Sequence, residues 1–80
     1  MRQHDRAEAL LRNALGGLRQ APLPMMKAKI LNSLGLVYAQ QQRVEKAKRC
    51  FGISLRIVNK QIGQKNWLYA RITDNLANLP

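Results

Sequence analysis

The sequence predicts an all-α fold in which four antiparallel helices form one small domain, and two observations lead to this prediction. Apolar residues recur at spacings of three and four in four separate segments, which is the period of a single helix face. Pro22, Pro24 and Gly63 fall between those segments, where helices are expected to end. A chain of 80 residues has room for one domain, so residues 1–80 are expected to form a single unit.

The first helix is expected over residues 3–18 and the second over residues 25–41. Pro22 and Pro24 place the break between them near residues 19–24, because proline does not fit the interior of a helix. The broad apolar stripe of the first helix comprises Ala7, Leu10, Leu11, Ala14, Leu15 and Leu18. That of the second helix comprises Ile30, Leu31, Leu34, Val37 and Tyr38.

The third helix is expected over residues 44–60 and carries two neighbouring apolar stripes, so it should pack against neighbours on two sides. One stripe holds Ala47, Phe51, Leu55 and Val58, and the other holds Cys50, Ile53 and Ile57. The fourth helix is expected over residues 65–79, after Gly63. Its apolar residues are Leu68, Ile72, Leu76 and Leu79.

The most specific pattern lies in residues 28–55, AKILNSLGLVYAQQQRVEKAKRCFGISL. Gly35 stands on the apolar face of the second helix beside Leu34, and Ala47 and Phe51 stand four apart on the third. Small residues let two backbones approach, and a neighbouring aromatic ring fills the space beside them. The pattern therefore predicts two antiparallel helices that cross closely.

Both kinds of helix recur in the chain. The run AKILNSLG at 28–35 returns as ARITDNLA at 70–77, 42 residues later, with Thr73 at the position of Leu31. The run Asp5-Arg6-Ala7 returns as Glu45-Lys46-Ala47, 40 residues later. Two matches at nearly the same period indicate an internal repeat rather than a chance similarity of amphipathic helices.

This combination resembles the tetratricopeptide repeat, in the variety with longer repeats that is seen in kinesin light chains. The resemblance implies a short superhelical stack in which 3–18 is the second-type helix of an incomplete repeat, 25–60 is one complete pair and 65–79 is the first-type helix of a further repeat. It assigns packing roles to one set of residues: Leu31, Leu34, Gly35, Tyr38, Ala47 and Phe51.

The resemblance also implies a non-enzymatic protein–protein interaction module, in which first-type helices line a concave face that binds a partner peptide or helix. Amide side chains can bond a peptide backbone there, and cations can hold a carboxylate. These side chains could also be ordinary solvated residues of a helix exterior. The expected partner-binding residues are Lys29, Asn32, Ser33, Leu36, Gln40, Arg71, Asp74, Asn75 and Asn78.

The chain is strongly basic, with 14 Lys and Arg against four Asp and Glu and a formal net charge of +10. This balance favours acidic partners, although cations on solvated helix faces also occur without any partner. A basic stripe on the third helix would lie on the convex side of the stack. The alternative function is therefore that of a basic nucleic-acid-binding accessory protein. The stripe consists of Lys46, Arg49, Arg56 and Lys60.

Self-association is expected because the first and fourth helices each lack one repeat partner, and exposed apolar stripes tend to become buried. The alternatives are a place within a longer repeat array and a purely structural oligomerisation segment. The residues expected to form an oligomer face are Leu68, Ile72, Leu76 and Leu79 on the fourth helix and Leu11 and Leu15 on the first.

Catalysis, metals and cofactors are not expected. The chain has one histidine, four dispersed carboxylates and no glycine-rich phosphate loop, and its single cysteine, Cys50, is expected to be a packing thiol. Trp67 begins the fourth helix and could be exposed there, but a contact that covers the third helix is the expectation. No segment reaches the roughly 20 apolar residues of a membrane span, so a cytoplasmic location without a membrane partner is expected.

Overall fold

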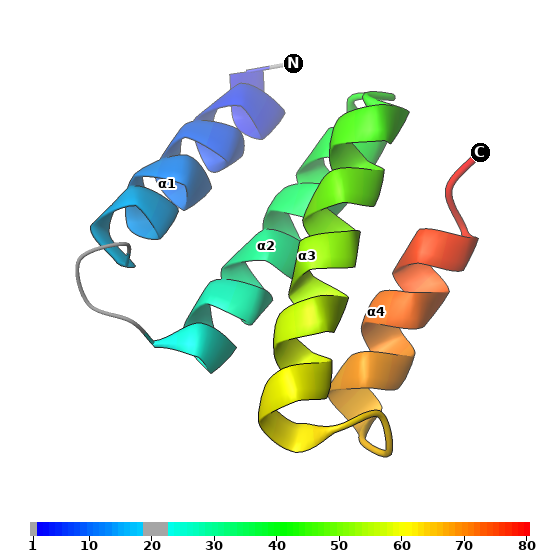
Figure 1. Ribbon diagram of the computed structural model, residues 1–80. Coiled ribbons are helices and arrows are strands. Elements are labelled where there is room, and N and C mark those ends of the chain that lie inside the picture. The colour runs from blue at the N-terminus through cyan, green and yellow to red at the C-terminus, as the bar shows by residue number, and fades with distance from the viewer. Residues whose placement is uncertain (1, 19–22) are drawn as a thin grey trace.

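The protein is described here by a computed structural model that covers residues 2–18 and 23–80, with the side chains of residues 5–13 and 23–80. Within these residues the chain forms helices joined by turns and no strands, which confirms the predicted all-α fold (Figure 1). Residues 19–22 of the predicted break lie outside the described residues. The four helices are α1 (Arg2–Leu18), α2 (Pro24–Gln40), α3 (Val44–Ile62) and α4 (Trp67–Ala77).

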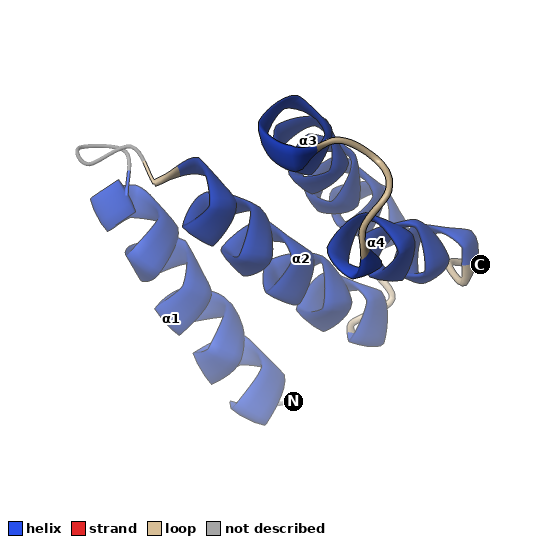
Figure 2. Ribbon diagram, turned by 90° about the horizontal axis from the view of Figure 1, so that it is seen from below, coloured by secondary structure: helices blue, strands red, loops and turns tan. Residues whose placement is uncertain are grey.

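Each helix packs on the next in sequence, and α2 and α3 share the largest contact. Figure 2 shows α2 and α4 on the same side of α3, with α1 beyond α2. The described residues form a slab of 35 × 32 × 17 Å. A helix with its side chains is about 10–12 Å across. The slab is therefore thinner than two full helix layers, and its interior is small.

The α2–α3 crossing is as close as the sequence pattern predicts. A Cβ placed on Gly35 would lie 2.6 Å from Cε1 and 2.8 Å from Cδ1 of Phe51, so only glycine leaves room for the ring. At the other end of the crossing, the Ser54 hydroxyl donates a 2.6 Å hydrogen bond to the carbonyl oxygen of Ala28. These contacts hold the two helices together at two neighbouring turns of α3.

All six residues that the repeat pattern assigns to packing are buried in the structure. Phe51 and Val58 on α3 are fully buried. Ser54 on the same side of α3 is also fully buried, and it brings a hydroxyl group into the small core. The second stripe of α3 packs as predicted too, because Cys50 is buried and Ile53 and Ile57 lie partly buried against the core. The third helix therefore has neighbours on two sides.

The joint between α2 and α3 is a specific hydrogen-bonded turn. The N–H of Gln42 donates to the carbonyl of Ala39 (3.0 Å), and the N–H of Arg43 donates to the carbonyl of Tyr38 (2.9 Å). This is the pattern of a Schellman C-cap. It requires a left-handed residue, and Gln42 takes that conformation with φ 62° where glycine is usual. The turn reverses the chain within three residues and so fixes the antiparallel pair.

The last helix is shorter than the predicted 65–79 because Asn66 caps its start. The Asn66 carboxamide oxygen accepts from the N–H of Tyr69, and its Nδ2 donates to the carbonyl of Gly63, both at 2.8 Å. Gly63 ends α3 with φ 81° and ψ −166°, a conformation almost restricted to glycine. The α3 helix runs to Ile62, two residues past its predicted end, and stops only at this glycine.

Polar contacts tie α1 to the joint. Glu8 lies 3.6 Å from Arg43 and 3.7 Å from Arg12, measured between guanidinium nitrogen and carboxylate oxygen. The Gln41 side-chain amide donates to Asp5 (3.3 Å) and to Glu8 (3.4 Å). Long or exposed ion pairs of this kind contribute little each. Glu8 acts as the common partner, and its side chain is 12% exposed.

Two buried groups in this region have raised pKa values. Burial, with a hydrogen bond to the Glu8 carboxylate and its charge, raises the pKa of Tyr38 above its ordinary 10.0. Burial also raises the pKa of the Cys50 thiol above 9.0, against a smaller opposing effect of Arg49. Both side chains are therefore held in their neutral forms by the fold.

Replacing Gly35 by alanine is expected to destabilise the protein by about 1–3 kcal/mol, because the new methyl group meets the buried ring of Phe51. Gly52→Ala is the matched control. A Cβ on Gly52 has no neighbour within 4 Å, so the better helix propensity of alanine should stabilise by up to about 1 kcal/mol. Urea denaturation monitored by circular dichroism measures both. Equal effects of the two substitutions would contradict the close crossing.

Stability is expected to fall in alkaline solution. A group whose pKa is raised by folding stabilises the fold below its unfolded pKa, and this contribution is lost as the pH rises through the folded pKa. For Cys50 and Tyr38 the loss should begin at about pH 9.0–10.0. Thermal melts near neutral pH and above it check this expectation. A Tyr38→Phe/Cys50→Ala variant that loses as much stability as the wild type between those conditions would contradict this assignment.

Candidate functional site

One exposed face of α2 carries four of the nine residues that sequence analysis assigned to partner binding. Lys29, Leu36 and Gln40 are exposed and Ser33 is partly exposed, at spacings of three and four that keep them on one side of the helix. Leu36 is an apolar side chain at the centre of this row, and it is 38% exposed. The face lies away from α3, because the opposite side of α2 provides the core.

The matching residues of α4 lie beside this face. Asn75 is half-buried, and its Nδ2 donates a 2.9 Å hydrogen bond to Oδ1 of Asn32, which is only 8% exposed. Arg71, Asp74 and Asn78 are exposed. The amide pair joins α2 to α4 directly, although the two helices are not neighbours in sequence. Sequence reasoning named both residues but not their contact, since the spacing of 43 residues carries no signal of it.

We call this surface the α2–α4 face. Around the Asn32–Asn75 bond it presents cations at Lys29 and Arg71, amides at Gln40 and Asn78, and one carboxylate at Asp74. The remaining polar atoms of the amide pair, Nδ2 of Asn32 and Oδ1 of Asn75, form no hydrogen bond within the described residues. Asn32 differs from the expectation in one respect. Because Asn32 is largely buried, its main role in this face is to hold α4 beside α2, and little of its side chain projects from the surface.

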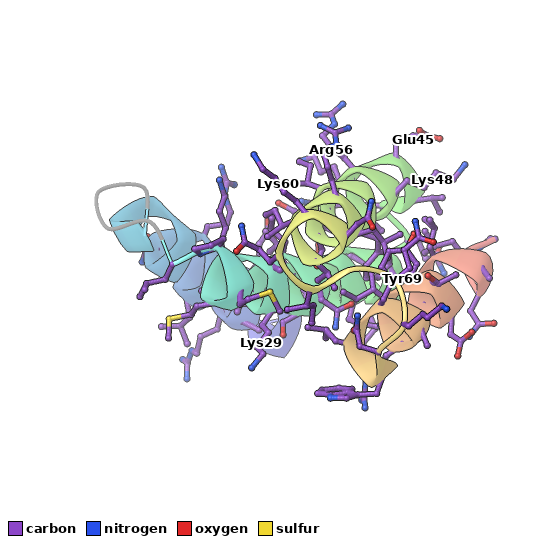
Figure 3. All side chains as sticks on the ribbon, turned by 60° about the horizontal axis from the view of Figure 1, so that its bottom comes forward. Lys29, Glu45, Lys48, Arg56, Lys60 and Tyr69 are labelled. Atoms are coloured by element: carbon purple, nitrogen blue, oxygen red, sulfur yellow. The ribbon has the colours of Figure 1, made fainter. Side chains whose placement is uncertain are left out.

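The basic stripe lies on the opposite side of the slab. Arg49, Arg56 and Lys60 are exposed on α3. Figure 3 shows Arg56 and Lys60 on the side of the molecule opposite Lys29. Lys46 is exposed as well, and its Nζ lies 5.5 Å from the centroid of the Tyr38 ring, within reach of a cation–π contact. The stripe and the α2–α4 face can therefore be altered independently.

The structure corrects the predicted oligomer face. Leu68 and Ile72 are buried within the core cluster and Leu76 and Leu79 lie partly buried against it, so these side chains serve the packing of α4 on α3. Leu11 is likewise partly buried against the core. The side chain of Leu15 lies outside the described residues. The spacing of the α4 residues was interpreted correctly as an apolar stripe. This stripe packs against α3, the preceding helix, and is not left free for a further helix after α4.

One exposed side of α4 carries Ala70, Thr73 and Ala77. In the sequence repeat these residues stand at the positions of Ala28, Leu31 and Gly35, which α3 covers on α2. On α2 this surface is buried by α3, whereas the corresponding surface of α4 is exposed. The α4 surface is made of small side chains.

Sequence reasoning also misplaced Trp67. This ring is 69% exposed, more than a residue that covered α3 would be, because the Asn66 cap places it at the first position of α4 with its side chain outward. Met26 was overlooked on the exposed face of α2, where it is 52% exposed. Its spacing of three from Lys29 is the signal that could have identified it.

Among the residues that the structure describes, no group of three or more His, Cys, Asp or Glu side chains is placed to hold a metal ion. None of the helices in the described ranges combines the length and the apolar character that crossing a bilayer requires.

Comparison with known proteins adds no identification. No family model, curated protein or solved structure matches the chain. The resemblance to tetratricopeptide repeats therefore depends on the residues of the chain itself, and what the structure establishes is an all-α stack of four helices with two chemically different faces.

Proposed function

We propose that the protein is a non-enzymatic interaction module that binds an extended segment of a partner protein along the α2–α4 face. The observation that carries the proposal is the Asn75–Asn32 hydrogen bond of 2.9 Å, which fixes two non-adjacent helices as one surface. The two amide atoms left over there are suited to a peptide backbone, which offers an N–H and a C=O at each residue. Leu36 adds an apolar contact at the centre.

The charges of this face indicate the kind of segment that fits it. Lys29 and Arg71 are exposed about one helical turn before Asn32 and Asn75, respectively, and Asp74 is the single carboxylate of this set. Arginine and lysine bind carboxylates through charge-assisted hydrogen bonds. The partner segment is therefore acidic, with at least one aspartate, glutamate or chain-terminal carboxylate.

The resemblance to tetratricopeptide repeats supports the same function, because first-type helices form the peptide-binding surface in that family. Here α2 and α4 are the helices at the first-type positions. The close α2–α3 crossing at Gly35 and Phe51 is what this architecture requires. An interaction surface of one complete pair and one further helix is shallow, so affinity for a short peptide is modest.

The alternative function is nucleic-acid binding through the basic stripe. Arg49, Arg56 and Lys60 favour it because they are exposed on one helix face. Such binding would depend on phosphate neutralisation and weaken steeply with salt.

The test uses two variants with the same change in net charge. Lys29→Glu/Arg71→Glu alters the α2–α4 face, and Arg56→Glu/Lys60→Glu alters the opposite face. Binding to a displayed library of acidic peptides should weaken roughly tenfold or more in the first variant, because each contact to a charged group contributes about 1.5–3 kcal/mol. The second variant should retain the wild-type affinity. Loss in the second variant alone would transfer the binding site to the basic stripe, and loss in neither would remove both.

We also propose that the open side of α4 mediates self-association, because Ala70 and Ala77 are exposed counterparts of residues that α3 buries on α2. Small side chains allow a second helix to approach closely, as Gly35 does for Phe51. A helix from another copy, or from further repeats, would complete the pair.

Light scattering at increasing protein concentration should therefore show a mass above that of the monomer of 9.1 kDa. Ala70→Glu/Ala77→Glu should restore the monomer, since a carboxylate does not fit a close helix crossing. Asn59→Glu, on the exposed side of α3, is the control and should leave the mass unchanged. A wild-type protein that stays monomeric at high concentration contradicts the proposal.

A further inference from the structure

One end of the helix stack gathers large exposed apolar side chains from three helices. Figure 1 shows that α2 begins, α3 ends and α4 begins at the same end of the molecule. Met26 lies in the first turn of α2, Ile62 is the last residue of α3 and Trp67 is the first residue of α4. All three side chains are between 52% and 69% exposed. Leu23, directly before α2, is 51% exposed and belongs to the same end.

The cations of this end are not matched by carboxylates. Lys27 and Lys29 lie in the first two turns of α2, Lys60 lies in the last turn of α3 and Lys65 lies in the loop before α4. The four acidic residues of the chain are found elsewhere: Asp5 and Glu8 near the start of α1, Glu45 near the start of α3 and Asp74 in the later half of α4. Figure 1 shows the starts of α1 and α3 and the last turn of α4 at the opposite end.

We call this region the cationic end, consisting of Leu23, Met26, Ile62 and Trp67 with Lys27, Lys29, Lys60 and Lys65. Exposed apolar side chains cost free energy in water, and their concentration at one end of a small protein marks an interaction surface. The surrounding lysines select an anionic partner.

We propose that the cationic end binds the surface of an anionic lipid bilayer. The apolar residues occupy the termini of three separate helices, so together they form the end of the slab rather than one stripe along a helix. A partner's amphipathic helix would instead dock on a continuous apolar stripe along the surface. Leucine, methionine, isoleucine and tryptophan side chains reach into the boundary between headgroups and acyl chains, where tryptophan is enriched. The lysines pair with anionic headgroups, and each contributes to binding near such a surface.

Nucleic acid fits this end less well. Phosphate neutralisation requires cations only and gives no role to Leu23, Met26 or Ile62. The sequence analysis expects no membrane partner because the chain lacks an apolar segment long enough to span one. A surface contact needs no such segment. It depends on residues that are up to 44 positions apart in sequence and that meet only when the chain folds.

Trp67 makes the proposal directly measurable, because it is the only tryptophan of the chain and is 69% exposed. The intact protein is titrated with vesicles of phosphatidylcholine alone and with vesicles of phosphatidylcholine mixed with phosphatidylserine. The tryptophan emission should move to shorter wavelength with the mixed vesicles only, and salt should reverse the shift. No shift with the mixed vesicles, or an equal shift with both, overturns the proposal.

Two pairs of variants locate the contact while keeping the Trp67 probe. Met26→Ser/Ile62→Ser and Lys60→Gln/Lys65→Gln alter the cationic end, and each should weaken vesicle binding roughly tenfold or more. Leu10→Ser/Leu36→Ser and Lys48→Gln/Arg49→Gln are the matched controls, since they change the same kinds of exposed side chain away from this end. Equal weakening in a variant and its control overturns the assignment.

Two further arms distinguish other occupants of the same end. A shift in emission that appears with rising protein concentration and no lipid would show that a second copy covers Trp67. An equal shift with a short DNA duplex in place of vesicles would show that a polyanion is sufficient. Either result overturns the proposal of a bilayer.

Discussion

The close crossing of α2 and α3 is the constraint on which the rest of the structure depends. Phe51 occupies the space that a side chain at residue 35 would need, and Ser54 bonds the backbone of α2 at Ala28. Because α3 also carries a second apolar stripe, the position of α4 follows from that of α3. The Asn32–Asn75 bond can then form, and with it the surface shared by α2 and α4. A shift of the α2–α3 crossing would therefore disturb the functional face without touching any of its residues.

The thin shape of the molecule explains why its faces are chemically distinct. A slab 17 Å thick has little interior, so most side chains must be exposed on one side or the other. The single layer of core residues is supplied mainly by α2, α3 and α4. Amides and a few cations are left on one side and arginines and lysines on the other. Several of the large apolar residues that the core does not accommodate, namely Leu23, Met26, Ile62 and Trp67, are found at helix termini. Net charge alone does not predict this separation.

The sequence predicted the all-α fold, the two-sided packing of α3 and the six packing residues, because these depend on spacing within one helix and on the size of side chains. It failed where the answer depended on contacts between distant residues. The bond between Asn32 and Asn75, the contacts of Glu8 with Arg43 and Gln41, and the outward position of Trp67 have no local signal. Leu68 and Ile72 show a related difficulty. Helical period identifies an apolar stripe, but it does not say which neighbour covers it.

The packing of each helix on its neighbour in sequence also has a consequence for how the chain folds. Contacts between adjacent helices close short loops, and chains with such local contacts fold rapidly. The α2–α3 pair has the largest contact and the tightest turn, so it is the natural nucleus of folding. Among the described side chains of α1, Asp5, Glu8 and the partly buried Leu11 contact the rest of the protein. The amide hydrogens of the α2–α3 pair are therefore expected to exchange with solvent only when the whole domain unfolds.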